Sequence, residues 1–213
     1  MAENLLQSIK GKRPEEIGRE YIDILISRSL FQKSREGDQC VAMHNLVHDM
    51  ARFVSAEFSL MLDGSDSQRL VSRTRYLACT NRGINAHDSF MQFQQLVSSE
   101  NIVLRTFLSL KEPTRDLSKN KLVLPKTSAV KVLRVLSLAC YQITSLDSSL
   151  ANLISIRYLN LSGNGFKEIP DNTITSLPYL QTLLLADCSR LIRLPKDIVS
   201  LTHLQISIFM EHQ

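Results

Sequence analysis

The segment IRYLNLSGN at residues 156–164 decides the fold, because the same pattern occurs in LRVLSLACY at 133–141 and in LQTLLLADC at 180–188. Each segment carries an aliphatic residue at its first, fourth and sixth positions, and the fourth-position leucines follow one another after 23 and then 24 residues. These leucines are Leu136, Leu159 and Leu183. A fourth unit starts at Leu204, 24 residues after Leu180. A near-constant period of this length indicates a repeat architecture.

The residues between these segments repeat as well, which argues against a chance run of leucines in a helix. Their apolar members fall into three matching sets: Ile143, Leu146, Leu150 and Leu153; Phe166, Ile169, Ile174 and Leu177; Leu191, Leu194, Ile198 and Leu201. The combination is typical of the leucine-rich repeat. A short strand points alternate side chains inward, and because one repeat alone cannot bury them, neighbouring repeats stack. The sequence therefore predicts a short solenoid with a parallel β ladder.

The repeat region is expected to cover residues 65–213, with irregular leading repeats to about residue 131 and regular repeats from residue 132. Two strand patterns occur in the irregular part: RTRYLAC at 73–79, which is expected to open the ladder, and LRTFLSL at 104–110. We expect these leading repeats to cap the N-terminal edge of the solenoid, since an uncapped edge exposes unpaired strand groups.

Outward-facing strand positions would form a surface for extended protein contacts, as in other repeat proteins. The candidate partner-binding residues are Val135, Ser137, Tyr158, Asn160, Thr182 and Leu184, with Arg134, Arg157 and Gln181 at the flank. For any single one of them, plain solvated surface is the alternative. After each strand, Asn164 and Cys188 stand where such repeats satisfy turn backbone groups with a polar side chain. Tyr141 departs from this pattern, so the first regular repeat is expected to be looser there.

Residues 1–64 predict a partial winged-helix subdomain. Pro14, followed by two glutamates, begins a helix that should run to about Leu30, since proline suits the first turn and acids suit the positive end of the dipole. The turn signal SREGDQ at 34–39 separates two short segments that would pair as a β-hairpin. A second helix follows, whose apolar side consists of Leu46, Val47, Met50, Ala51 and Val54. The fold class is therefore α/β, a partial winged helix followed by the repeats.

The stretch VAMHNLVHDM at 41–50 admits three interpretations. A metal site would use His44 and His48, but a zincin requires Glu directly after its first histidine and Asn45 stands there. The remaining histidines are scattered through the sequence, which leaves no evident third ligand. A structural interpretation makes Asn45 a helix N-cap, worth about 1 kcal/mol over Ala. The third interpretation comes from a family resemblance.

The stretch VAMHNLVHDMARFVS, preceded by EEIGREYIDILISRSLFQ and followed by leucine-rich repeats, resembles a junction in plant nucleotide-binding leucine-rich-repeat (NLR) immune receptors of the coiled-coil type. In that family the winged-helix subdomain ends in a Met-His-Asp motif, which corresponds here to Met43, His44 and Asn45. The resemblance implies that His44 contacts the phosphates of ADP in a full-length receptor. It also implies a cytoplasmic role in defence against pathogens. There the repeats would bind a pathogen effector, a guarded host protein or the receptor's own nucleotide-binding domain.

The chain by itself is expected to bind no nucleotide. A phosphate-cradling P-loop requires G-x-x-x-x-G-K-[ST], and the seven glycines offer no such frame. ADP or ATP would therefore be a cofactor only of a full-length member of the family. Asn45 also replaces the aspartate of the family motif, which removes a negative charge beside a helix N-terminus and is expected to weaken the locked, closed state.

Composition narrows the remaining function classes. Hydrophobic residues make up 44% of the 213 residues and charged residues 22%, which predicts a buried core, and no apolar run is long enough to predict a membrane span. The four cysteines are isolated, which fits a reducing compartment and no cysteine metal site. The absence of a Lys/Arg cluster disfavours nucleic-acid binding. No catalytic signature is evident, so we expect a non-enzyme. The rival hypotheses are a free-standing leucine-rich-repeat signalling adaptor and a metal-dependent hydrolase.

Overall fold

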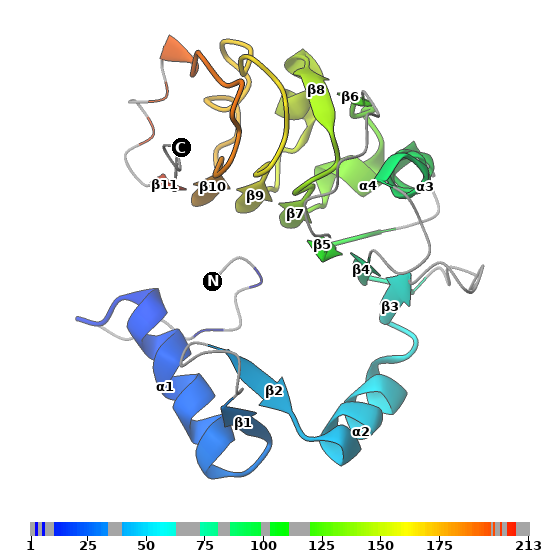
Figure 1. The fold of residues 1–213 in the computed structure, drawn as a ribbon, viewed down its shortest axis with the longest axis vertical. Helices are drawn as coiled ribbons and strands as arrows, with labels where there is room; N and C mark the ends of the chain where they lie inside the picture. The colour runs from blue at the N-terminus through cyan, green and yellow to red at the C-terminus, as the bar shows by residue number, and fades with distance from the viewer. Residues whose placement is uncertain are drawn as a thin grey trace. The chain divides into compact units, whose positions relative to one another are not determined.

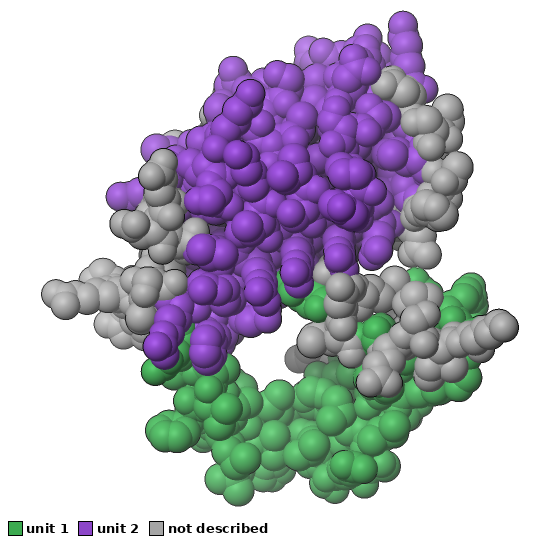
Figure 2. All heavy atoms as spheres, turned by 180° about the vertical axis from the view of Figure 1, so that it is seen from behind, with its two compact units in different colours: residues 1–57 green, residues 58–213 purple. Residues whose placement is uncertain are grey.

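The computed structural model describes residues 3, 6, 11–33, 40–62, 73–80, 86–98, 103–110, 120–196, 198, 201 and 204–207. The chain divides into two compact units, an N-terminal unit of Met1–Glu57 and a repeat unit of Phe58–Gln213 (Figure 2). The domain boundary predicted at residue 64 lies later than this division. The reason is that the strand Ser59–Leu62 (β3) pairs with the strand Tyr76–Thr80 (β4) and so joins the repeat unit.

The N-terminal unit consists of a helix, a two-stranded hairpin and a second helix, in the predicted order. Pro14 stands at the start of the first helix, and Glu16 accepts a hydrogen bond from the Arg13 backbone N–H (3.1 Å). The hairpin is antiparallel, with Phe31 opposite Met43, and the predicted turn at 34–39 lies outside the described residues. The elements are α1 (Pro14–Ser27), β1 (Phe31–Lys33), β2 (Val41–Met43) and α2 (Asn45–Ser55).

The repeat unit is built on a seven-stranded sheet in which every pair of neighbours is parallel, as the repeats predict (Figure 1). Across the sheet, the neighbouring strands follow the order β11-β10-β9-β7-β5-β4-β3. Both strand patterns predicted in the irregular region are present as β4 and β5, but β4 does not open the ladder, because β3 precedes it. Besides β3 and β4, the strands are β5 (Thr106–Leu110), β7 (Val135–Ser137), β9 (Tyr158–Asn160), β10 (Thr182–Leu184) and β11 (Gln205–Ser207).

The remaining elements lie in the return halves of the coils, and Figure 1 shows two of them, β6 and β8, across the repeat unit from the strands β7, β9 and β10. β6 and β8 form a second parallel pair, and Glu168 and Arg193 form one further parallel bridge. Thr127, which caps α4, also donates through Oγ1 to the Val97 carbonyl at the end of α3 (2.5 Å). These elements are α3 (Ala86–Ser98), β6 (Asn120–Leu122), α4 (Ser128–Lys131), β8 (Ile143–Leu146) and the 3-10 helix η1 (Ser148–Asn152).

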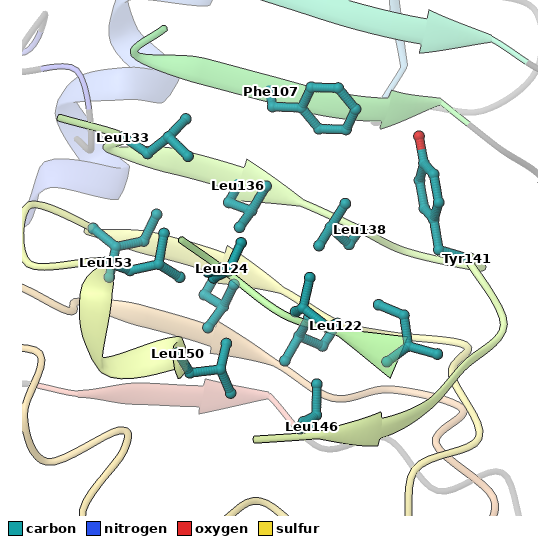
Figure 3. Close-up of a cluster of buried hydrophobic side chains, with 14 of the residues drawn as sticks. Phe107, Leu122, Leu124, Leu133, Leu136, Leu138, Tyr141, Leu146, Leu150 and Leu153 are labelled. Atoms are coloured by element: carbon teal, nitrogen blue, oxygen red, sulfur yellow. The ribbon is translucent and has the colours of Figure 1, made fainter. Parts of the chain in front are cut away.

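Inward-pointing aliphatic side chains form one continuous core through the coils (Figure 3). Leu136, Leu159 and Leu183 are opposite one another in the ladder and are all fully buried. Burying a leucine is worth about 1.5–3 kcal/mol, so these stacked rows stabilise the repeat unit.

The position of the Tyr141 side chain contradicts one prediction. The first regular repeat was expected to be looser there, yet the Tyr141 side chain is fully buried and its ring lies 6.4 Å from that of Phe107. The Tyr141 backbone carbonyl accepts a hydrogen bond from Asn120 Nδ2 (2.6 Å). The prediction was wrong because an aromatic side chain can fill the core while a neighbouring coil supplies the polar group. Burial also raises the pKa of the Tyr141 phenol.

Each regular coil turns at the same position after its strand. Cys140, Gly163 and Asp187 have φ values of 60°, 66° and 56°, and they occupy equivalent places in the three repeats. This left-handed region costs a residue with a Cβ roughly 1–2 kcal/mol. At Gly163 space is limited too, because a Cβ there would lie 2.7 Å from Cys140 Sγ.

We predict that Gly163→Ala lowers the free energy of unfolding of the repeat unit by about 1–2 kcal/mol, from the strained φ and the clash with Cys140. Gly165→Ala is the matched control, because its Cβ would meet no atom closer than 3.9 Å and its φ is not positive. Urea unfolding followed by circular dichroism would measure both. Equal stability of the two variants would contradict the prediction.

Candidate functional site

The register of the ladder brings all six predicted partner-binding residues onto one face of β7, β9 and β10. They form two rows across the strands: Val135, Tyr158 and Thr182 in the first, and Ser137, Asn160 and Leu184 in the second. Five of them are partly exposed, whereas the Ser137 side chain is buried. Ser137 therefore offers little area for contact.

An arginine row runs beside this face. The residue immediately before each of four consecutive strands is arginine, and each donates its backbone N–H to the carbonyl of the residue at the same position in the preceding coil. Arg105 donates to Arg75, Arg134 to Arg105, and Arg157 to Arg134, each at 2.8 Å. Gln181 continues the line by donating to the Arg157 carbonyl at 2.9 Å. We call Arg75, Arg105, Arg134 and Arg157 the arginine row.

Four permanent positive charges thus attach to backbone positions about 4.8 Å apart, the separation of neighbouring strands. Arg105 is exposed and the other three are half-buried. Tyr76 and Tyr158 directly follow Arg75 and Arg157 and are partly exposed at the strand starts. Arg and Tyr are the residue types enriched in binding hot spots, so this edge of the ladder has the chemistry of a protein-binding surface.

Arg134 and Arg157 were predicted at the flank, but Arg75 and Arg105 were not. The regular repeats are 23 and 24 residues long, whereas Arg75 and Arg105 are separated by 30 residues and Arg105 and Arg134 by 29. A fixed period therefore does not extend into the irregular part. The available signal was local: R-Y-L, R-T-F, R-V-L and R-Y-L stand at the four strand starts.

His44 lies at the junction of β2 and α2, next to the half-buried Met43 and the exposed Asn45. His44, and not Asn45 as predicted, is the N-cap: its Nδ1 accepts from the Leu46 backbone N–H (3.3 Å). Its φ and ψ of −60° and 139° place the extended-to-helical change at His44, so Asn45 is already the first helical residue. With Nδ1 as acceptor, a neutral imidazole carries its proton on Nε2, which can donate to an anion.

His48 has a local partner. Its Nδ1 lies 3.5 Å from Asp49 Oδ1, and both side chains are more than half exposed. Among the described residues, no three His, Cys, Asp or Glu side chains come together in a way that could hold a metal ion. In the same described part, no helix combines the length and the apolarity that crossing a membrane requires.

Cys140 and Cys188 are buried, and burial raises the pKa of each thiol, with the nearby Asp187 adding to the effect. Cys188 Sγ lies 3.3 Å from the Leu161 carbonyl, in the polar position predicted for it. Thiols in this environment are largely protonated at neutral pH and are poor nucleophiles, which fits a structural role.

A helix–hairpin–helix unit followed by leucine-rich coils on a parallel ladder fits the predicted order of a partial winged helix and leucine-rich repeats. Family comparison agrees: residues 1–51 match the family described as disease resistance protein winged helix domain, and residues 116–211 match a leucine-rich repeat region. Over both regions the chain is therefore similar to plant disease resistance proteins, and curated members of that group resemble it as well.

Two of these relatives are from Arabidopsis thaliana. A putative disease resistance protein is 36% identical over 187 residues, covering 86% of this chain and 13% of the relative. Putative disease resistance RPP13-like protein 1 is 36% identical over 189 residues, covering 86% of this chain and 17% of the relative. Putative disease resistance protein RGA1 of Solanum bulbocastanum is 30% identical over 171 residues, covering 77% of this chain and 13% of the relative. The matched region is thus under a fifth of each of these proteins.

Proposed function

We propose that this chain provides recognition and regulation in an intracellular plant immune receptor, and that the outward face of its ladder binds an acidic segment of a protein. The observation that carries the proposal is the arginine row, four arginines held in register on adjacent rungs by backbone hydrogen bonds of 2.8 Å. Because the ladder fixes their spacing before binding, little backbone ordering is lost when a partner docks.

Three kinds of partner have this role in the family that the chain resembles: a pathogen effector, a guarded host protein and the receptor's own nucleotide-binding domain. An acidic surface on any of them would complement the row, and Tyr158 and Leu184 on the adjoining face would add apolar contact area. The similarity to disease resistance proteins favours this proposal over a free-standing adaptor. We also propose that the leucine-rich coils of the repeat unit together form a solenoid.

The arginine row makes a direct prediction about binding. A fluorescent glutamate-rich peptide should bind the full chain, and the double variant Arg105→Glu with Arg157→Glu should weaken that binding at least about ten-fold, since it removes two attractions and adds two repulsions. Fluorescence anisotropy at about 0.1 M salt would measure the dissociation constants.

The matched control for this experiment is Lys126→Glu with Lys167→Glu. It changes the net charge by the same amount at exposed positions outside the arginine row, so it should alter the affinity less than about three-fold if position matters. If the two double variants weaken the peptide equally, general electrostatics accounts for the binding and the proposed site is wrong.

We further propose, from the family resemblance, that His44 contacts an ADP phosphate within a full-length receptor, with Met43 and Asn45 flanking it. The supports are its exposure and the Nδ1 hydrogen bond to Leu46, which leaves Nε2 as a donor. The fit is limited to this one contact, because the sequence has no P-loop to cradle the phosphates. ADP bound in such a receptor would favour its closed packing and so shift the population away from the open one.

One histidine cannot supply useful affinity, so we predict that ADP does not bind this chain alone. Isothermal titration of the chain at about 100 μM with ADP should show no heat beyond dilution, corresponding to a dissociation constant weaker than about 1 mM. His44→Ala should behave identically. A micromolar dissociation constant that His44→Ala abolishes would show that the chain carries a complete nucleotide site.

A further inference from the structure

The helix α2 exposes a large apolar face. Leu46, Met50, Phe53 and Val54 are 72%, 68%, 85% and 71% exposed, and no residue of α2 is buried. Among the described residues, no other helix or strand exposes even one large apolar side chain beyond two thirds. Soluble proteins rarely leave contiguous apolar side chains of this size uncovered unless something binds there.

The sequence places these side chains together. Their spacing of four, three and one residues puts them on one side of a helix, and the four-then-three step is the seam spacing of packed helices. The opposite side carries His48 and Arg52, with Asp49 at the flank. The His44 cap begins the helix directly where the hairpin ends.

The charges of α2 limit the kinds of molecule that could bind its apolar face. An interfacial membrane helix needs a polar side rich in Lys and Arg, but α2 has one arginine and one aspartate and no net formal charge. The same balance gives no attraction for nucleic acid or for a strongly charged protein. An uncharged apolar protein surface is what remains, and a second α2 offers one of matching size and chemistry.

The exposed apolar area of α2 is also sufficient for a specific interface between two copies. Phenylalanine alone offers about 150–250 Å², so four side chains with these exposures present on the order of 500 Å² per copy. Two copies would bury about 1,000 Å², which is the lower bound for a specific interface. A helix without net charge meets its own copy without electrostatic repulsion.

We propose that α2 is a self-association surface through which two copies of this chain pair, with their α2 helices antiparallel. Met50 lies at the centre of the apolar face, so it meets Met50 of the second copy, and Leu46 of each copy packs near Val54 of the other. The interface is isologous, as in most homodimers, and small enough to be reversible at micromolar concentration.

Sedimentation velocity on the full chain from about 1 to 100 μM tests this pairing. The expected result is a monomer–dimer equilibrium, weakened at least ten-fold by Phe53→Asp. Because Phe53 is 85% exposed, this variant should keep its fold, as circular dichroism would verify. The matched control is Ile192→Asp, a substitution of an equally exposed apolar residue (83%) in the repeat unit, which should leave the equilibrium unchanged.

Cross-linking gives a second readout. In a Cys40→Ser background, which removes the exposed native cysteine, Met50→Cys should form an intermolecular disulfide under mild oxidation, whereas Arg52→Cys on the opposite side should not. A chain that stays monomeric at 100 μM overturns the proposal and would point to another protein as the cover. A dimer that Phe53→Asp does not weaken overturns it as well, and would point to a sheet edge.

Discussion

Replacing Asn164 by alanine is expected to lower the free energy of unfolding of the repeat unit by about 3 kcal/mol or more. The Asn164 side chain is 3% exposed and connects two coils. Its Oδ1 accepts from the Ile143 N–H (3.0 Å), and its Nδ2 donates to the carbonyls of Leu138 (2.9 Å) and Leu161 (2.7 Å). Alanine would leave these buried backbone groups without that partner, at about 1–3 kcal/mol each. Urea unfolding followed by circular dichroism would measure the loss.

Asn160→Ala provides the matched control for this prediction. Asn160 is also an asparagine of the second regular repeat, and its Oδ1 accepts from the Ser162 N–H (2.9 Å), but its side chain is half-buried and faces outward. Water can replace such a bond, so we expect a loss below about 1 kcal/mol. Asn164→Asp should also destabilise strongly, because a carboxylate cannot donate to Leu138 or Leu161. If both alanine variants unfold alike, the buried amide is not a structural link between the coils.

The regular coils could be predicted because their signal is local and periodic. Leu136, Leu159 and Leu183 recur after 23 and 24 residues, and burial demands that they stack, so the parallel ladder follows from spacing alone. The six outward residues follow too, since side chains alternate along a strand. Their role in binding remains a prediction.

The irregular coils could be predicted only in part, because no constant period extends into them. The residues of β3 fall inside the predicted N-terminal subdomain of residues 1–64, because their pairing with β4 is known only from the fold. Without that register, Arg75 and Arg105 could not be connected to Arg134. The N-cap was misplaced by one residue, because His44 and Asn45 can both cap and only the backbone dihedrals distinguish them.

Phe107→Ala should lower the free energy of unfolding by about 3–5 kcal/mol, the range for a buried phenylalanine. Phe107 is fully buried, its ring lies 4.6 Å from Phe93 of α3 and 6.4 Å from Tyr141 of the first regular repeat, and the three rings connect the irregular coils to the regular ones. We therefore expect a single cooperative urea transition, shifted as a whole. Intrinsic tyrosine fluorescence and circular dichroism should report the same midpoint.

Leu110→Ala on the same strand is the control, since Leu110 is 52% exposed and its loss should cost less than about 1 kcal/mol. Two separate transitions, of which Phe107→Ala shifts only the weaker, would contradict cooperative folding of the irregular and regular coils.

The stability of β5 also affects the arginine row. Arg105 precedes Phe107 by two residues and receives its position from the pairing of β5 with β7. Partial unfolding of β5 would leave Arg134 and Arg157 in register but separate them from Arg75 and Arg105. Because the irregular and regular coils are expected to unfold together, Phe107→Ala should lose its binding of the glutamate-rich peptide at urea concentrations where Leu110→Ala still binds the peptide fully.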